Sequence, residues 1–485
     1  MVFSDLFFLF AFLPAFALCY VLGAFIDRAC ASLQTAKNMV LILFSLLFYA
    51  WGEPVYVLLM LGSVLLNYFC GLVIDRHDGP RRRWALAVGV ACNLLILATF
   101  KYLGFLASTL TGLGLRVEAP SIALPIGISF YTFQSISYLV DVYRRQSPVQ
   151  RRLMGVLLYI SMFPQLIAGP IVRYGTVAHE INHRHVSASD FAEGLYRFLR
   201  GLGKKVIVAN QLSEISSLFL VDELPTLTTT GAWVGIIAFT LQIYFDFSGY
   251  SDMAIGLGRC LGFHFNENFS HPYCCHTITD FWRRWHISLG SFFRDYVYIP
   301  MGGNRRHQAA NILVVWFLTG MWHGASWNFI IWGLYFGIIV SIEKYTLLRW
   351  ISRAPTLLRR LLSPLLHAYA LALVVIGWGI FYFDDFVQMR MFLASLFAQR
   401  GTPLHDFLTV SALTNYFWLW VVAVLLSMPL HTEAAALVRR FLPDGSTVHA
   451  AVVFTARLVI SLATLVISVA LLVGATNNAF IYTRF

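Results

Sequence analysis

The amino-acid sequence predicts an all-α polytopic membrane protein. Of its 485 residues, 58% are hydrophobic and 12% are charged, whereas a soluble domain carries about 25% charged residues. Aromatic residues make up 16% of the chain, which is typical of packed apolar helices with rings at the lipid headgroup level. Many apolar stretches also reach the length of about 20 residues that a spanning helix needs. Lipid is therefore the expected main solvent.

We expect about 10 to 13 membrane segments, including re-entrant ones. The first stretch contains Asp5 and is not preceded by Lys or Arg, so it lacks the basic region of a cleavable signal peptide and is expected to be retained. The expected segments are 3–25, 38–51, 53–74, 84–112, 121–143, 153–172, 206–221, 231–256, 310–344 as two short arms, 365–384, 414–430 and 452–475.

The formal net charge of +11 comes from short basic clusters between the apolar segments. This distribution is typical of cytoplasmic loops that follow the positive-inside rule, and anionic membrane lipid is the expected partner. A nucleic-acid-binding role is not favoured. The main clusters are Arg76 with Arg81–Arg83, Arg144–Arg145 with Arg151–Arg152, Arg197 with Arg200 and Lys204–Lys205, Arg305–Arg306, and Arg349 to Arg360.

The seven cysteines are an odd number and lie mostly in apolar segments, so no disulfide framework is expected. His271, Cys274, Cys275 and His276 lie close to a metal-ligand spacing. No second Cys/His pair follows at the separation of a closed zinc site. We therefore expect no bound metal.

The segment 153–172 is expected to be re-entrant. If all basic clusters face the cytoplasm, an even number of crossings separates each pair, but the interval from Arg152 to Arg197 holds one long apolar segment. Pro164 and Gly169-Pro170 can break a helix there, and irregular backbone at membrane depth is tolerated against protein or a water-filled cavity. The alternative is a kinked ordinary span. Residues 191–205 have a helical period of apolar and basic positions, as in an interfacial helix.

Polar side chains interrupt the apolar segment 231–256. Gln242, Asp246, Ser248 and Asp252 follow one another there. Polar and acidic residues inside a span are costly and face a bundle interior or a cavity, so they are candidates for a functional site. The alternative is a buried network in which Asp246 or Asp252 ties two helices together.

A second polar region, residues 279–288, is expected to form one helix that Thr277 or Thr279 caps. Trp282 and His286 would then lie at i and i+4 on one face, with Arg283 beside them. Arg283 and Arg284 could bind the phosphates of an acyl donor. Equally, they could be interfacial residues whose heads reach the headgroups.

His323, next to Trp322, lies deep in the apolar stretch 310–344. A helix from Ala310 to Trp322 rises roughly 20 Å, less than the ~30 Å hydrocarbon core, and Gly320 and Gly324 permit a turn. His323 is therefore expected inside the membrane. A neutral histidine can accept a proton from a hydroxyl near pH 7. The alternative is a core histidine bonded to a backbone carbonyl.

Five motifs follow one another along the chain: Met1-Val-Phe-Ser4, Phe163–Ile171, Gln242–Met253, Asp280-Phe-Trp-Arg-Arg-Trp-His-Ile-Ser-Leu289 and Thr319-Gly-Met-Trp-His-Gly-Ala-Ser-Trp327. Together and in this order they resemble the alginate O-acetyltransferase branch of the membrane-bound O-acyltransferase (MBOAT) family. The resemblance covers residues 1 to about 345. It implies a single membrane domain, 1–485, with a motif-bearing catalytic core over 121–345 and C-terminal membrane helices over 346–485.

The resemblance also implies a helical bundle around a transmembrane tunnel, with His323 as the essential histidine and His286 as the second motif histidine. We expect Asp246, Arg283, Trp282, Trp322, Gln242 and Asp252 to support them or bind substrate. The implied protein is a multi-pass protein of the bacterial inner membrane. It would carry acetyl from a cytoplasmic donor, expected to be acetyl-CoA, to an extracytoplasmic hydroxyl, with no bound cofactor.

The implied partners are an SGNH-hydrolase-like acetyltransferase, periplasmic or membrane-anchored, and a polysaccharide synthase or secretion complex. The sequence leaves open whether the polymer is alginate, a cellulose or another exopolysaccharide, and whether the immediate acceptor is a sugar or a serine of the partner. Two alternative classes are a transporter or flippase of an acyl donor or glycan, for which buried carboxylates are also suited, and a non-catalytic scaffold.

Overall fold

The structure is a computed structural model that describes residues 1–30, 34–118, 122–430, 434, 436, 446–474 and 481. Every regular element in these residues is a helix, which confirms the predicted all-α class. The chain forms two compact units: the first contains Met1–Gly201 and Tyr250–Glu267, and the second contains Leu202–Gly249 and Asn268–Ile481. Each unit is described separately below.

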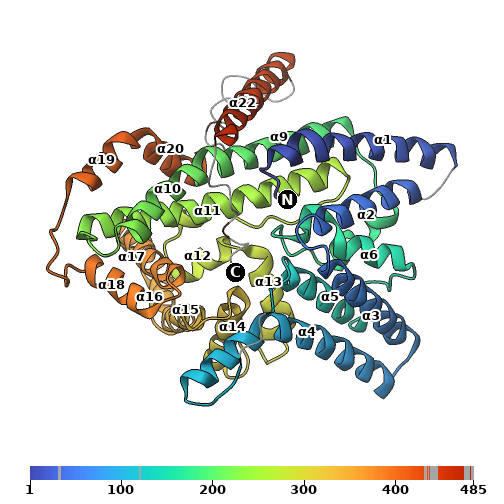
Figure 1. Cartoon of the computed structure of the whole chain (residues 1–485), viewed down its shortest axis with the longest axis horizontal. Coiled ribbons are helices and arrows are strands. Elements are labelled where there is room, and N and C mark those ends of the chain that lie inside the picture. The colour runs from blue at the N-terminus through green and yellow to red at the C-terminus, as the bar shows by residue number, and fades with distance from the viewer. Residues whose placement is uncertain are drawn as a thin grey trace. The chain divides into compact units, whose positions relative to one another are not determined.

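The first unit begins with consecutive helices that run antiparallel to one another (Figure 1). An aromatic cluster in its core contains Phe3, Phe8, Phe48 and Phe163, which are all at most 1% exposed. The elements are η1 (Phe8–Phe12), α1 (Leu13–Ala29), α2 (Thr35–Ala50), α3 (Tyr56–Arg76), α4 (Pro80–Gly112), α5 (Ile128–Tyr143), α6 (Leu153–Ser161), α7 (Phe163–Leu166), α8 (Tyr174–Asn182), α9 (Ala188–Gly203, which ends in the second unit) and the C-terminal part of α11 (Thr229–Cys260).

The segment 153–172 is broken, as the prolines predict. α6 ends at Ser161, the short α7 follows, and Ile167–Arg173 has no regular structure. The freed backbone is buried against protein: the hydroxyl of Ser45 accepts the N–H of Phe163 at 3.0 Å, and Tyr159 donates to the carbonyl of Val172 at 2.9 Å. Irregular backbone at membrane depth needs such partners.

The second unit contains the remaining helices. The elements are η2 (Lys204–Ala209), α10 (Asn210–Ser217), η3 (Leu218–Asp222), the N-terminal part of α11, η4 (Pro272–Cys274), α12 (Ile278–Arg284), α13 (Ile287–Phe293), η5 (Arg294–Tyr298), α14 (Gln308–His323), α15 (Trp327–Tyr345), α16 (Leu347–Arg353), α17 (Thr356–Tyr382), α18 (Phe386–Leu396), α19 (Phe407–Asn415), α20 (Phe417–Ser427) and α22 (Thr447–Val473). η2, α10 and η3 follow one another without a break and cover the expected segment 206–221, whereas α20, in the expected segment 414–430, is bent against α19.

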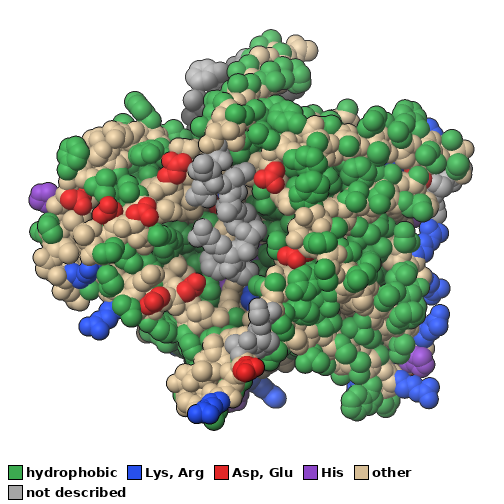
Figure 2. All heavy atoms as spheres, in the orientation of Figure 1, with side chains coloured by type: hydrophobic (Ala, Val, Ile, Leu, Met, Phe, Trp, Pro, Cys, Tyr) green, Lys and Arg blue, Asp and Glu red, His purple; other side chains and the backbone are tan. Residues whose placement is uncertain are grey.

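Seven helices of the described residues are long and apolar enough to cross a membrane, or eight if the bent pair α19–α20 is one span. The remaining membrane segments that the sequence predicts correspond to shorter apolar helices and to broken segments, as expected for a protein with re-entrant parts. Large apolar side chains such as Leu58, Trp84 and Val73 are exposed on these helices. Figure 2 shows hydrophobic side chains over much of the surface. The protein is therefore a multi-pass membrane protein.

Candidate active site

α14 and α15 form the antiparallel hairpin that carries His323 (Figure 1). The sequence predicts two short arms here. The structure has two arms, of which α14 is short, with 16 residues, whereas α15 and α16 together are long enough to span a membrane. Their backbones approach closely at Gly320, where a Cβ atom would lie 2.3 Å from the carbonyl oxygen of Phe329. Gly320 therefore serves close packing within α14, and the turn begins after His323, at Gly324.

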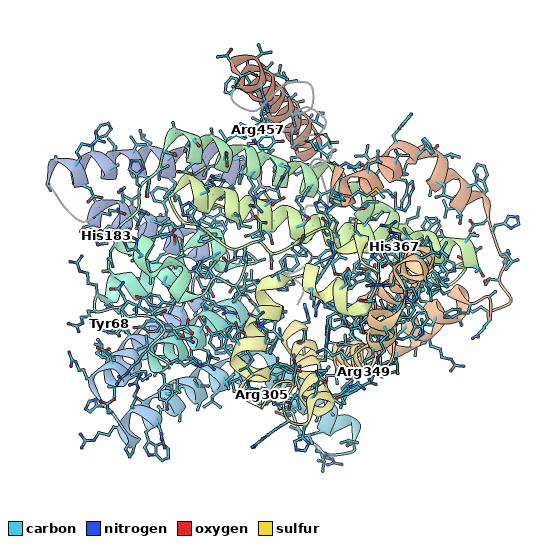
Figure 3. The ribbon with its side chains drawn as sticks, turned by 180° about the vertical axis from the view of Figure 1, so that it is seen from behind. Tyr68, His183, Arg305, Arg349, His367 and Arg457 are labelled. Atoms are coloured by element: carbon cyan, nitrogen blue, oxygen red, sulfur yellow. The ribbon has the colours of Figure 1, made fainter. Side chains whose placement is uncertain are left out.

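The two basic clusters that flank this hairpin lie at its open end. Arg305 precedes the start of α14, and Arg349 follows the end of α15 (Figure 3). His323 is the last residue of α14, about 22 Å from the first at 1.5 Å per residue. This rise is shorter than a ~30 Å hydrocarbon core. The position of His323 inside the membrane stays a prediction.

His323 is 4% exposed and lies in an aromatic pocket. Its ring centroid is 4.9 Å from that of Trp322, 5.0 Å from that of Trp332 and 5.4 Å from that of Phe381, all in edge-on arrangements. These rings exclude water from the imidazole and fix its plane. The sequence predicts Trp322 as a neighbour, but it gives no indication that Trp332 and Phe381 also contribute.

His286 occupies a corner between two helices, so the predicted single helix over 279–288 is wrong. α12 ends at Arg284 and α13 begins at Ile287, with His286 in the left-handed region at φ 44°. Trp282 and His286 therefore do not share a helix face. The predicted cap is confirmed, since the Thr277 hydroxyl accepts the N–H of Asp280 at 3.0 Å.

Asn268 holds the His286 ring in one orientation. Its side-chain oxygen accepts the Ser288 hydroxyl at 2.8 Å and lies 3.0 Å from Nδ1 of His286. Nδ1 therefore carries the proton and donates it to Asn268, which leaves Nε2 as a proton acceptor. Nε2 is buried and has no hydrogen-bond partner among the residues that the structure describes.

His286 remains neutral at physiological pH. α12 and α13 lie outside the helices that are long enough to span a membrane. Burial lowers the pKa of His286 to about 3, because a charged imidazolium would lose its hydration. A neutral ring with a free Nε2 can accept a hydrogen bond from a hydroxyl.

Trp322 connects the two histidines. Its ring centroid lies 5.6 Å from that of His286 and 4.9 Å from that of His323. The ring centroid of Trp282 lies 5.4 Å from that of Trp332, and Trp332 in turn contacts His323. The structure thus gathers Trp282, His286, Trp322 and His323 into one cluster.

Asp246 and Gln242 lie on α11 and are committed to other partners. Asp246 is 1% exposed and forms an ion pair with Lys205, whose Nζ is 2.6 Å from Oδ1. Its Oδ2 accepts the backbone N–H of Ile481 at 2.8 Å, and Gln242 accepts the Ser216 hydroxyl at 2.7 Å. Phe247, which follows Asp246 in the sequence, contacts His286 at 4.7 Å between ring centroids. Asp246 therefore anchors the helix that packs on His286.

Asp252 belongs to the other compact unit, where it forms an ionic network. Arg197 lies 2.9 Å and Arg200 lies 3.2 Å from its Oδ1, and Arg197 also pairs with Glu267. The alternative that Asp252 ties helices together agrees with this geometry. Sequence reasoning did not identify these arginines as its partners, because 52 to 55 residues separate them from Asp252.

Two adjacent arginines of α12 differ in their surroundings. Arg284 pairs with Asp280 at 2.9 Å, one turn earlier in the helix. Arg283 is exposed and has no acidic partner among the described residues. An unpaired guanidinium is available for an anion such as a phosphate.

The four residues with metal-like spacing have other contacts. The ring of His271 lies 3.2 Å from the carbonyl oxygen of Ser427, and that of His367 lies 2.8 Å from the carbonyl oxygen of Cys275. In the part of the chain that the structure describes, no three His, Cys, Asp or Glu residues lie together as a metal site would need.

The fold is a polytopic bundle of apolar helices in which two buried histidines lie beside Trp322, and comparison with known proteins gives its class. Residues 48–383 match the model of the membrane-bound O-acyltransferase family. The chain belongs to this family, and it is therefore an acyltransferase.

Three relatives of this chain are the following proteins. The probable alginate O-acetylase AlgI of Pseudomonas aeruginosa is 42% identical over 81% of this chain and 74% of its own length. The protein of the same name from Azotobacter vinelandii is 43% identical over 84% of this chain and 80% of its own. The peptidoglycan O-acetyltransferase of Helicobacter pylori is 36% identical over 71% of this chain and 70% of its own.

Proposed function

We propose that this protein is an O-acetyltransferase of exopolysaccharide modification. It moves acetyl from a cytoplasmic donor, acetyl-CoA, through the bacterial inner membrane to an extracytoplasmic hydroxyl. The observation that carries the proposal is the pair His323 and His286 on either side of Trp322, in a buried aromatic pocket. The names of the relatives from Pseudomonas, Azotobacter and Helicobacter support acetyl transfer to a glycan.

In the proposed reaction, His323 is the general base. It takes the proton of the acceptor hydroxyl while the hydroxyl oxygen forms a bond to the carbonyl carbon of the acetyl thioester. The carbon–sulfur bond then breaks, and the proton passes from His323 to the leaving thiolate. His286 accepts a hydrogen bond at Nε2 and orients the reacting groups.

The other site residues support this chemistry. Arg283 binds a phosphate of the donor, because it is exposed and no acidic side chain of the described residues pairs with it. Trp282 and Trp322 keep water from the thioester, which would otherwise be hydrolysed. Gln242 and Asp246 hold α11 against His286, and Asp252 stabilises the ionic network of the first unit.

The proposed partners are an SGNH-hydrolase-like acetyltransferase, periplasmic or membrane-anchored, and a polysaccharide synthase or secretion complex. The partner would complete transfer to alginate or a cellulose-like polymer. Two observations support a separate partner for this last step. The regular structure of the described residues is entirely helical, and no separate polar block interrupts the apolar segments of the sequence.

The His323→Ala variant tests the proposed function. Purified protein in liposomes receives labelled acetyl-CoA, and acetyl transfer or thioester hydrolysis is measured at matched abundance. We expect a loss of about 100-fold or more, since general-base catalysis contributes about 10² to 10⁴. Unchanged turnover in His323→Ala would refute the mechanism, and transport of the donor or a glycan without any turnover would indicate a transporter.

A further inference from the structure

Glu343 is a fully buried carboxylate on α15 that hydrogen-bonds the first turn of α12. It is 0% exposed. One oxygen accepts the N–H of Ile278 at 2.7 Å, and the other accepts both the N–H and the hydroxyl of Thr279 at 2.7 and 2.6 Å. The hydroxyl of Tyr369 lies 3.3 Å away as a fourth donor. Four donors compensate the lost hydration of this carboxylate.

α12 runs along α15 from this anchor toward the histidines. At its start lie Ile278 and Thr279, which contact Glu343 near the end of α15. In the middle, Trp282 packs on Phe336 and Trp332 at 4.9 and 5.4 Å between ring centroids. The chain then turns at His286, which reaches Trp322. α12 thus spans the distance between Glu343 and the site.

Arg283 and His286 both depend on how α12 is placed along α15. The side chains that pack α12 against the hairpin are apolar rings, which resist sliding weakly because they have no directional bonds. The hydrogen bonds of Glu343 are directional and charge-assisted, and they involve backbone groups. A bidentate carboxylate therefore sets the register of α12.

We propose that Glu343 is a positioning residue that sets where Arg283 and His286 lie relative to His323. The kinetic part of this inference rests on the proposed acetyl transfer. The Glu343→Gln variant replaces one acceptor oxygen by an amide NH2, which then faces a donor of α12. α12 must shift to avoid this contact, and His286 moves with it.

Asp27 provides a matched control in the other compact unit. It is 6% exposed, and its two oxygens accept the N–H groups of Ala36 and Lys37 at 2.8 and 3.0 Å at the start of α2. Asp27→Asn removes the same kind of helix-start carboxylate from a unit that contains neither histidine. It measures the structural cost of such a change alone.

The experiment has two readouts per folded molecule. The first is kcat for acetyl transfer from acetyl-CoA in liposomes. The second is the rate at which diethylpyrocarbonate modifies His286, measured by mass spectrometry, because this ring is 2% exposed in the parent. We expect Glu343→Gln to lower kcat by about 100-fold, the effect of a 1 Å misplacement, and to raise the modification rate several-fold. Asp27→Asn is expected to change the folded yield and neither readout.

Each result decides the inference. Loss of kcat with faster modification of His286 supports it, whereas a change in one readout without the other, or in neither, overturns it. If Glu343→Gln does not accumulate, Thr279→Val provides a milder form of the test, because it removes one of the four bonds to Glu343 and keeps both backbone bonds. Both readouts should then change in the same directions by a smaller factor. If the parent transfers no acetyl group, the proposed function fails, while modification of His286 still tests the position of α12.

Discussion

The buried ion pair of Lys205 and Asp246 allows a quantitative prediction. Its atoms are 2.6 Å apart, and the side chains are 4% and 1% exposed. Asp246→Asn removes the carboxylate that faces the buried ammonium of Lys205, and Lys205→Met removes the ammonium that faces the buried carboxylate of Asp246. Each single change is expected to lower the free energy of unfolding by about 3 to 5 kcal/mol.

The double change Lys205→Met with Asp246→Leu gives the opposite expectation. Two apolar side chains of similar size are often neutral or stabilising in place of a buried ion pair. The N–H of Ile481 loses its acceptor, which costs about 1 to 3 kcal/mol. The double variant should therefore be more stable than either single variant by about 2 kcal/mol.

The assay is equilibrium unfolding in mixed micelles, followed by tryptophan fluorescence, together with acetyl transfer at matched folded amount. The double variant should recover both stability and transfer relative to the single variants, since Asp246 acts by holding α11 and Phe247 against His286. Single variants as stable as the parent would refute the reasoning about burial. A stable double variant without transfer would assign Asp246 a direct role in the chemistry.

Two further predictions concern the α12–α13 segment. Arg283→Gln should raise the KM for acetyl-CoA about tenfold, as expected for one lost charged contact of about 1.4 kcal/mol. The control Arg284→Gln breaks the pair with Asp280 and should leave this KM unchanged. Equal effects of the two variants on KM in steady-state kinetics would contradict the assignment of Arg283. Because burial holds the pKa of His286 near 3, below its ordinary value of 6.5, His286 stays neutral from pH 5 to 8. His286→Gln should thus lower the rate without changing the shape of the pH profile over that range; the disappearance of an apparent pKa near 6.5 would show that His286 titrates there.

The sequence predicted the helical segments well because long apolar runs mark them in the amino-acid composition. Runs of apolar residues, breaks at Pro164 and the two arms around His323 follow from length and local residue type. The corner at His286 was missed for the opposite reason. A histidine in the left-handed region is uncommon, and its stabilisation comes from Asn268, 18 residues earlier.

The site was predicted in part. His323, Trp322 and His286 lie together as expected, but Asp252 belongs to an ionic network in the other unit. Lys205 and Glu343 were missed as partners, because charged residues near the ends of apolar segments resemble ordinary boundary residues. Their importance depends on which distant backbone or carboxylate they meet, and a single sequence does not specify those pairings.

The hairpin of α14 and α15 has a consequence for lipid dependence. Its backbones are in close contact at Gly320, and its basic ends and His323 belong to the same compact unit. Arginine side chains at the ends of membrane helices reach the lipid headgroups, so we expect Arg305 and Arg349 to place the open end at one leaflet. The length of the hairpin then sets how far His323 lies from the headgroups of that leaflet. A thicker bilayer would then lengthen the path on the opposite side of the histidine and leave the distance from His323 to the arginine side unchanged.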